Sequence, residues 1–244
     1  MTSPPELNKK LAAKIASLRD QLKSLKKGWN SDRKELEVEL NQALEKFHKS
    51  IESTIRTLEE TVKLKDPYTA NHQRRVAELS RAIAEEMNLS GDEVYGVFLS
   101  ASLHDIGKIA IPSELFTKGE KLNQYEYLII KSHPEFGYKI LKNLEFPWPI
   151  ENIAYKHHER LDGSGYPNGI KGDKIELETR IISVADVIEA MISYRPFRPP
   201  LGVEAALEEV ERNKGIQYDP QVVEACLELF KKGFEFEEGM IKKE

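Results

Sequence analysis

Cysteine is nearly absent from this chain, and long apolar runs are absent altogether. One cysteine, Cys226, among 244 residues excludes a disulfide framework and a cysteine-based zinc site. No apolar run approaches the roughly 18 residues that a membrane-spanning helix needs, and the first ten residues contain no apolar signal core. We therefore expect a soluble, cytoplasmic protein in which Cys226 belongs to the core.

An excess of positive charge is also lacking. The chain has 41 acidic and 36 basic residues, which gives a formal net charge of −5. Proteins that bind duplex nucleic acid normally present a strongly basic face. The balance of charge therefore argues against duplex nucleic acid as a partner.

Glycine and aromatic residues are scarce in the first part of the chain. Residues 1–65 contain one of the 14 glycines and two of the 20 aromatic residues, and they carry a net charge of +4. The remainder carries −9. This change near Asp66 predicts a helical segment over 1–65, a globular domain over 66–236 and a tail over 237–244.

The first segment has the apolar spacing of a coiled coil. Steps of three and four residues keep one narrow stripe facing a partner helix, and they predict a parallel homodimer. Gly28 and the cluster 30–32 leave two geometries open, an antiparallel hairpin or a rod interrupted near 28–31, and we favour the interrupted rod. The stripe consists of Leu11, Ile15, Leu18, Leu22, Leu25, Trp29, Leu36, Leu40, Leu44, Phe47, Ile51, Ile55, Leu58 and Val62.

After Asp66 the pattern is one amphipathic helix after another, with no alternating strand pattern. Val76, Leu79, Ile83 and Met87 mark one apolar helix face. Ser90 with Glu93 and Asn123 with Glu126 are capping boxes that predict two helix starts. Further helices are expected near 149–159, 177–192, 203–212 and 219–232, so the fold class is all-α.

The histidines are the residues that indicate a possible metal site. Five of the six histidines lie after Asp66; Asp105 directly follows one of them, and Asp186 lies within an apolar run. A buried carboxylate costs several kcal/mol unless it is paired or metal-bound. Nitrogen and oxygen donors without a thiolate suit Fe or Mn, and Zn less well. Seven such residues match two ions, and a binuclear phosphohydrolase uses such a pair. They are His72, His104, Asp105, His133, His157, His158 and Asp186.

Two motifs carry a family resemblance. His72, the His104-Asp105 pair and Asp186 resemble the signature of the HD phosphohydrolase superfamily. Residues 157–167 read HHERLDGSGYP, which is similar to the motif of the HD-GYP family of cyclic di-GMP phosphodiesterases. The likeness extends from 66 to about 230. It implies an all-α HD-domain bundle of about seven helices that hydrolyses cyclic di-GMP to linear pGpG, or further to GMP.

The resemblance also implies roles for individual residues. The seven residues given above match the family's metal ligands, which would hold two divalent ions, with Asp105 bridging them and the nucleophilic hydroxide between them. Lys108 would contact the scissile phosphate and stabilise its developing charge. Tyr166 would lie against the dinucleotide, while Arg195 and Arg198 would hold its phosphates and guanines.

Three positions depart from the family pattern. Tyr68 stands where members with a third metal have an acidic residue, so we expect two ions; Glu189 and Phe197 replace a common aspartate and tyrosine. Two alternatives stay open: a non-catalytic receptor that binds cyclic di-GMP and relays it through the N-terminal helix, and a hydrolase of another cyclic dinucleotide or nucleotide. An upstream sensor or a diguanylate cyclase is the partner that the resemblance suggests.

Overall fold

The computed structural model describes residues 4–65, 67–194 and 199–236, and within them it contains helices, turns and loops but no strand. The all-α prediction is therefore confirmed. Contacts divide the chain into two units, residues 1–54 and 55–244. None of the described helices combines the length and the apolarity that crossing a membrane requires.

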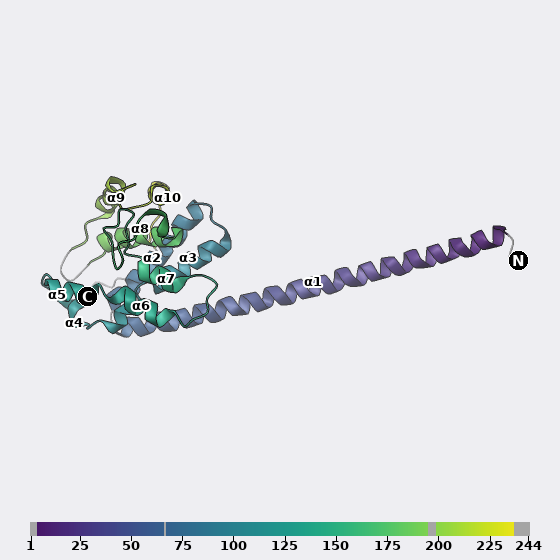
Figure 1. Ribbon diagram of the computed structural model, residues 1–244, viewed down its shortest axis with the longest axis horizontal. Helices are drawn as coiled ribbons and strands as arrows, with labels where there is room; N and C mark the ends of the chain where they lie inside the picture. Colours follow the sequence, from purple (N-terminus) through teal and green to yellow (C-terminus); the bar gives the residue numbers. More distant parts are fainter. Residues whose placement is uncertain (1–3, 66, 195–198, 237–244) are drawn as a thin grey trace. The chain divides into compact units, whose positions relative to one another are not determined.

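The N-terminal helix α1 (Pro4–Lys65) is continuous over 62 residues (Figure 1). It passes through residues 28–31 without a break, so the predicted interruption is wrong and the hairpin is excluded. A glycine in a helix interior costs only about 1 kcal/mol relative to alanine. Leu25, Lys26 and Lys27, which have high helix propensity, precede Gly28, and nothing lies within 4 Å of where its Cβ would be. The helix therefore continues through this position.

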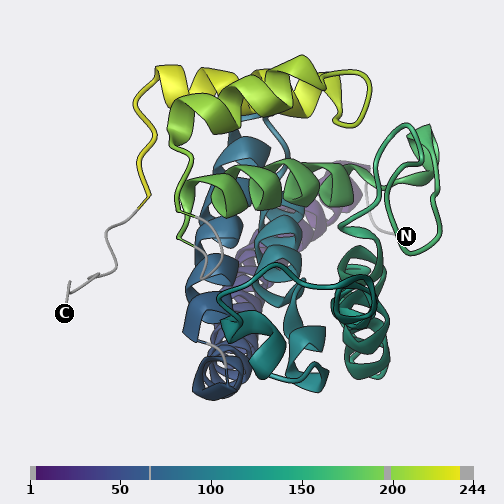
Figure 2. The same cartoon turned by 90° about the vertical axis from the view of Figure 1, so that its left-hand side faces the viewer.

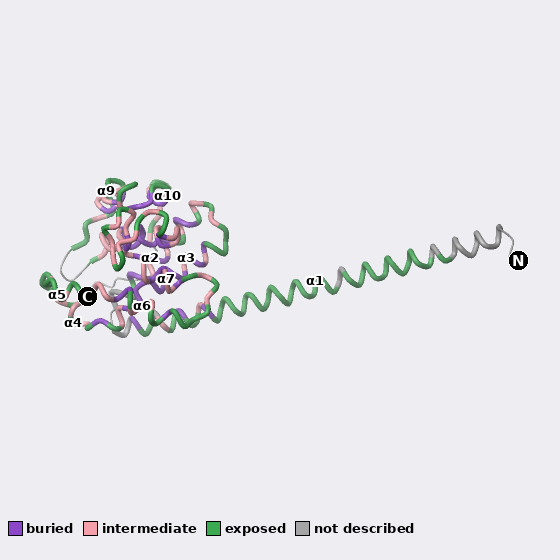
Figure 3. Tube along the Cα trace, viewed as in Figure 1, coloured by how far each residue is buried: buried purple, intermediate pink, exposed green. Residues whose placement is uncertain are grey.

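The apolar stripe of the first unit is open to solvent. Its described residues before position 50 are between 46% and 71% exposed, and Figure 3 shows the helix exposed along most of this stretch. A row of exposed leucines on one helix face is unusual for a monomer. The coiled-coil partner stays a prediction. These residues are Leu18, Leu22, Leu25, Trp29, Leu36, Leu40, Leu44 and Phe47.

The second unit begins with the last turns of α1 and contains nine further α-helices and two 3-10 helices among the described residues. This exceeds the expected number of about seven because α4 and α5 are short connecting helices. The elements are α2 (Pro67–Glu86), α3 (Gly91–Leu103), η1 (Ile106–Ala110), α4 (Glu114–Thr117), α5 (Gln124–Ile130), α6 (His133–Leu141), α7 (Ile150–Lys156), η2 (Gly172–Lys174), α8 (Leu177–Ile192), α9 (Val203–Arg212) and α10 (Pro220–Lys231).

Helix α2 is the centre of this bundle. It packs against α3, α8 and α10, and α9 and α10 lie beside each other over α8 (Figure 2). The predicted apolar face of α2 is confirmed, because Val76, Leu79 and Ile83 are fully buried. Cys226 of α10 is buried in the same core. Both predicted capping boxes are present, at the start of α3 and of α5.

A close approach of two backbones joins η1 to α6. A Cβ atom on Gly107 would overlap the carbonyl oxygen of His133 and the amide nitrogen of Gly137. Only glycine allows this spacing. Gly107 therefore fixes where α6 begins, and with it the position of His133 relative to Asp105.

We expect Gly107→Ala to destabilise the protein by at least about 1–3 kcal/mol, the usual cost of overpacking, because both atoms in the way are backbone atoms. Urea unfolding followed by circular dichroism measures the effect. Gly91→Ala is the matched control, since nothing lies within 4 Å of the Cβ position there. Equal unfolding midpoints for the two variants would contradict this account of Gly107.

Candidate metal centre

The structure brings all seven predicted metal ligands together from separate parts of the second unit. They form two groups, each with its nitrogen or oxygen ligand atoms within 4.8 Å of one another. Six of the seven are buried and His158 is half-buried. One group is Asp105, His133, His157 and His158; the other is His72, His104 and Asp186.

Asp105 lies between the two groups. Its Oδ2 is 3.5 Å from Nε2 of His72 and 3.4 Å from Nε2 of His104. Its Oδ1 is 3.1 Å from Nε2 of His133 and 3.8 Å from Nε2 of His157. Each carboxylate oxygen thus faces one group, which is the arrangement that a bridging carboxylate requires.

Helix ends fix the proton positions of three histidines. The ring Nδ1 atoms of His104, His133 and His157 lie 2.6, 2.7 and 2.8 Å from the carbonyl oxygen three residues earlier. A carbonyl oxygen only accepts, so each Nδ1 carries the hydrogen. These carbonyls belong to helix ends, where intrahelical partners are missing. The Nε2 lone pairs are left directed toward Asp105.

Electrostatics hold the cluster in its ligating state. Burial disfavours the charged form of Asp105, but Lys108 and His104 outweigh it and keep the pKa of this carboxyl well below its usual range. His72 does the same for the pKa of Asp186 against its burial. Burial and the neighbouring imidazoles lower the pKa values of His157 and His158 well below their ordinary range. At neutral pH this gives charged carboxylates at Asp105 and Asp186 and neutral imidazoles at His157 and His158, which are the forms that bind metal ions.

Two atoms of the cluster indicate that it suits a divalent metal. Nε2 of His104 and Oδ1 of Asp105 are buried without a hydrogen-bond partner. Buried polar atoms are rarely left in this state unless an ion or water completes them. Imidazole nitrogens and carboxylate oxygens together are the donors that divalent transition metals accept. The residues therefore fit a divalent metal site.

Tyr166 and Lys108, two of the predicted substrate-binding residues, lie beside the cluster. The Tyr166 ring stacks on His158, with centroids 4.6 Å apart, and Nζ of Lys131 lies 4.6 Å from the Tyr166 centroid. Burial raises the pKa of Tyr166, so its hydroxyl stays protonated. Nζ of Lys108 is 2.5 Å from Oδ2 of Asp105.

Glu159 holds the loop that carries Tyr166, a role that the sequence analysis missed. Its buried carboxylate accepts hydrogen bonds from the amides of Asn168, Gly169 and Ile170 at 2.7, 3.2 and 3.1 Å. A Cβ on Gly165 would overlap the backbone at His158 to Arg160. An acidic residue that directly follows the His-His pair and precedes a glycine-rich loop is the signal that could have identified it.

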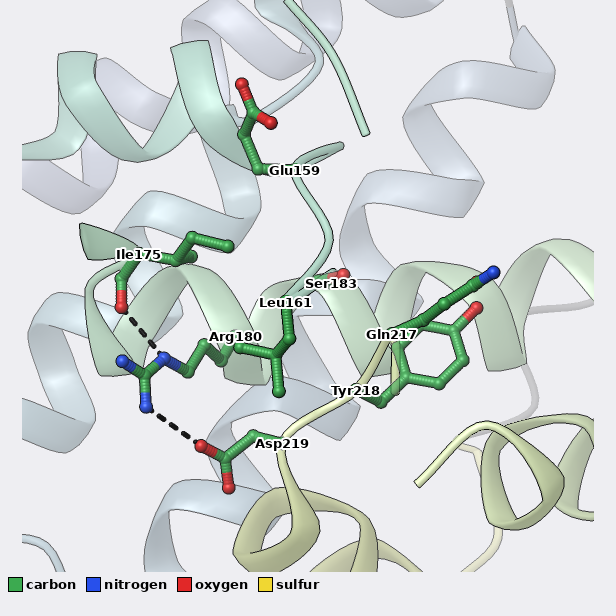
Figure 4. A pocket seen from close by; sticks show the side chains of 8 residues that line it. All are labelled: Glu159, Leu161, Ile175, Arg180, Ser183, Gln217, Tyr218 and Asp219. Atoms are coloured by element: carbon green, nitrogen blue, oxygen red, sulfur yellow. Dashed lines mark hydrogen bonds and ion pairs between the residues drawn. The ribbon is translucent and has the colours of Figure 1, made fainter. Parts of the chain in front are cut away.

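A small pocket lies behind this loop (Figure 4). Nη1 of Arg180 lies 2.9 Å from Oδ2 of Asp219, and Nε of Arg180 donates to the carbonyl of Ile175 at 2.8 Å. Its charged groups are thus engaged within the chain, and the pocket is structural. It is lined by Glu159, Leu161, Ile175, Arg180, Ser183, Gln217, Tyr218 and Asp219.

Some predicted positions cannot be placed relative to this cluster. Arg195, Phe197 and Arg198 lie outside the described residues, as does the side chain of Tyr68. Two contacts at the cluster were not predicted from the sequence, the ion pair of Arg75 with Glu189 and the contact of Glu189 with His72. Their spacing was the available signal, because Arg75 follows His72 and Glu189 follows Asp186 by three residues, one helical turn.

Residues 56–222 match the family model described as the HD domain. The chain belongs to the HD-domain family. Among curated relatives of this HD-domain chain is the "Cyclic di-GMP phosphodiesterase response regulator RpfG" of Xanthomonas campestris, 35% identical over 92% of this chain and 58% of its own length. A "Cyclic di-GMP phosphodiesterase" of Thermotoga maritima is 43% identical over 68% of this chain and 46% of its own length. The HD-domain chain thus spans about half the length of the curated relatives it matches, and their names support its resemblance to the HD-GYP family.

Solved structures show the same HD-domain fold. The cyclic GMP-AMP-specific phosphodiesterase V-cGAP3 of Vibrio cholerae superposes with a TM-score of 0.52 over 66% of this chain and 44% of that chain. The two sequences are 21% identical there, so this likeness shows the fold alone. The predicted HD-domain helical bundle is confirmed.

The lowered pKa values of His157 and His158 predict a stability that falls on acidification in the metal-free protein. The unfolded chain takes up these protons near the ordinary pKa of 6.5, while the folded chain does not. Below about pH 6.5 the unfolded state therefore binds more protons than the folded state. The free energy of unfolding decreases as the pH is lowered below that value.

Urea unfolding with a chelator present, between about pH 7 and about pH 5, measures this dependence. We expect His157→Gln to reduce the slope, because its side chain does not titrate. His48→Gln is the control, since His48 is exposed and lies outside the cluster. A slope that His157→Gln leaves as steep as in the wild type would contradict the assignment.

Proposed function

We propose that this chain is a metal-dependent phosphodiesterase that hydrolyses cyclic di-GMP to linear pGpG. The observation that carries the proposal is the placement of Asp105, whose two oxygens each face one group of ligating side chains. The names of its curated relatives support the substrate. In the reaction water adds to phosphorus as one P–O3′ bond breaks, which opens the ring and leaves a 5′-phosphate.

We assign two divalent ions, Fe or Mn, to the two groups of ligands. When bound, such ions polarise phosphoryl oxygens and make water acidic enough to act as a nucleophile near neutral pH. The residues that would hold them are His72, His104, Asp105, His133, His157, His158 and Asp186.

The remaining roles fall to residues at the rim of the cluster. Lys108 places a cation 2.5 Å from Asp105, where it would stabilise the charge that develops on the phosphoryl oxygens. Tyr166 offers a protonated hydroxyl and a ring face to the nucleotide. Arg195 and Arg198 would pair with its second phosphate and its guanines.

The first test is anaerobic purification, elemental analysis for Fe, Mn and Zn, and an assay of cyclic di-GMP on the same day. We expect about two ions per chain and pGpG as the product. Cyclic GMP-AMP in a parallel assay tests the alternative that another cyclic dinucleotide is the substrate. Binding of cyclic di-GMP without turnover would instead support a receptor.

Asp105→Ala tests the centre of the mechanism. Loss of the carboxylate between the two groups should lower turnover by at least about 1,000-fold, since one preorganised electrostatic group contributes about that much. Asp173→Asn is the matched control, because Asp173 is a fully exposed acidic residue of the same domain. Normal turnover by Asp105→Ala would refute the bridging role.

We also propose that α1 forms a parallel homodimer through its exposed stripe and passes the signal of an upstream sensor or cyclase to the HD domain. Two such stripes would cover each other's leucines in a coiled coil. The support is the exposure of the described stripe residues before position 50.

Leu40→Glu should halve the mass measured by light scattering, because it buries a charge in the proposed seam. Val38→Glu is the control: Val38 is also exposed but lies on the opposite face of the helix. If the measured mass were unchanged in both variants, or halved in both, this apolar stripe would be ruled out as the dimer contact.

A further inference from the structure

Glu189 is a fully buried carboxylate at the edge of the metal-ligand cluster. It lies on α8, one turn after Asp186. One of its oxygens, Oε2, accepts the Nδ1 hydrogen of His72 on α2. The other, Oε1, accepts from Nε and Nη2 of Arg75 at 2.9 and 2.6 Å and from the hydroxyl of Ser193 at 2.5 Å. Every polar atom of this carboxylate is therefore engaged.

This contact distinguishes His72 from three other histidines of the cluster. His104, His133 and His157 each donate Nδ1–H to a neutral backbone carbonyl. His72 donates to a carboxylate instead, and its Nε2 points to the shared centre, 3.0 Å from Oδ1 of Asp186. A carboxylate behind an imidazole fixes the ring's orientation and makes the opposite nitrogen a stronger donor than a carbonyl does.

We infer that Glu189 is the positioning residue for His72, and that Arg75 and Ser193 hold its carboxylate in place for this role. The inference rests on the metal-binding part of the proposed function but not on the identity of the substrate. Glu189 touches no substrate in this account; it acts through His72. The glutamate side chain reaches from α8 to His72 and Arg75 on α2 at once.

The charge of Glu189 is already balanced within the protein. Arg75 pairs with it through two nitrogens, and the guanidinium of Arg75 in turn lies 5.5 Å from the ring centroid of Phe236 in the segment after α10. Both oxygens of Glu189 are also engaged, whereas Oδ1 of Asp105 has no hydrogen-bond partner, so Glu189 is a poor candidate for a further metal ligand. It is well suited to hold a ligand in place.

The test is metal affinity rather than activity. Metal-free protein is titrated with Mn²⁺ by calorimetry, and urea unfolding of the same samples reports stability. We expect Glu189→Gln to weaken binding at the site that includes His72 by about 10- to 100-fold, the usual effect of removing such a partner. Asp219→Asn is the matched control, because it too breaks a buried arginine–carboxylate pair, with Arg180, but contacts no metal ligand.

A second variant separates affinity from stability. Glu189→Gln alone leaves the guanidinium of Arg75 without its charge partner, which lowers stability. The double variant Arg75→Gln with Glu189→Gln removes that charge, so we expect its unfolding midpoint to recover while its Mn²⁺ affinity stays low. Equal Mn²⁺ affinities of the wild type and Glu189→Gln, or equal losses in Glu189→Gln and Asp219→Asn, would overturn this inference alone. If the wild type bound neither Mn²⁺ nor, under anaerobic conditions, Fe²⁺, the proposed function would be overturned as well.

Discussion

The burial of Asp105 is the constraint on which the rest of the metal-ligand cluster depends. Its carboxylate is 1% exposed, yet Lys108 and His104 keep it ionised. A lone buried carboxylate is expensive, so the fold must surround it with partners from several directions. No single helix can do this. The clustered side chains therefore come from α2, α6, α8 and the segments after α3 and α7, and the close packing at Gly107 brings His133 near Asp105.

Carbonyl groups at helix ends orient three imidazoles of the cluster without adding a charge to it. A helix end offers carbonyls that have no partner in the helix. His104, His133 and His157 each follow such an end and donate one ring hydrogen to it. His104 and His157 directly follow a helix and His133 is the first residue of α6, so each lies where the end of the preceding helix can select its tautomer. Glu159 orders a loop in a comparable way. Its one buried carboxylate accepts hydrogen bonds from three backbone amides of the loop that carries Tyr166.

The features of this molecule that could be predicted from the sequence are those that depend on residues close together in the chain. Apolar spacing located α2 and α8, capping boxes located α3 and α5, and the order of the motifs identified the seven clustered residues. The predicted interruption at Gly28 is wrong because a single glycine inside a helix costs only about 1 kcal/mol, too little to break α1. The Arg75–Glu189 pair joins residues 114 positions apart, so only the packing of α2 on α8 reveals it.

Position around His72 separates three carboxylates that meet there. Oδ2 of Asp105 and Oδ1 of Asp186 lie 3.5 and 3.0 Å from Nε2 of His72, the ring nitrogen that faces the cluster. Oε2 of Glu189 contacts Nδ1, on the opposite side of the same ring. A carboxylate behind an imidazole orients that imidazole, whereas carboxylates in front of it can share its ion. Asp105 and Asp186 are thus placed to face the ions that we propose, and Glu189 to hold the histidine that would bind one of them.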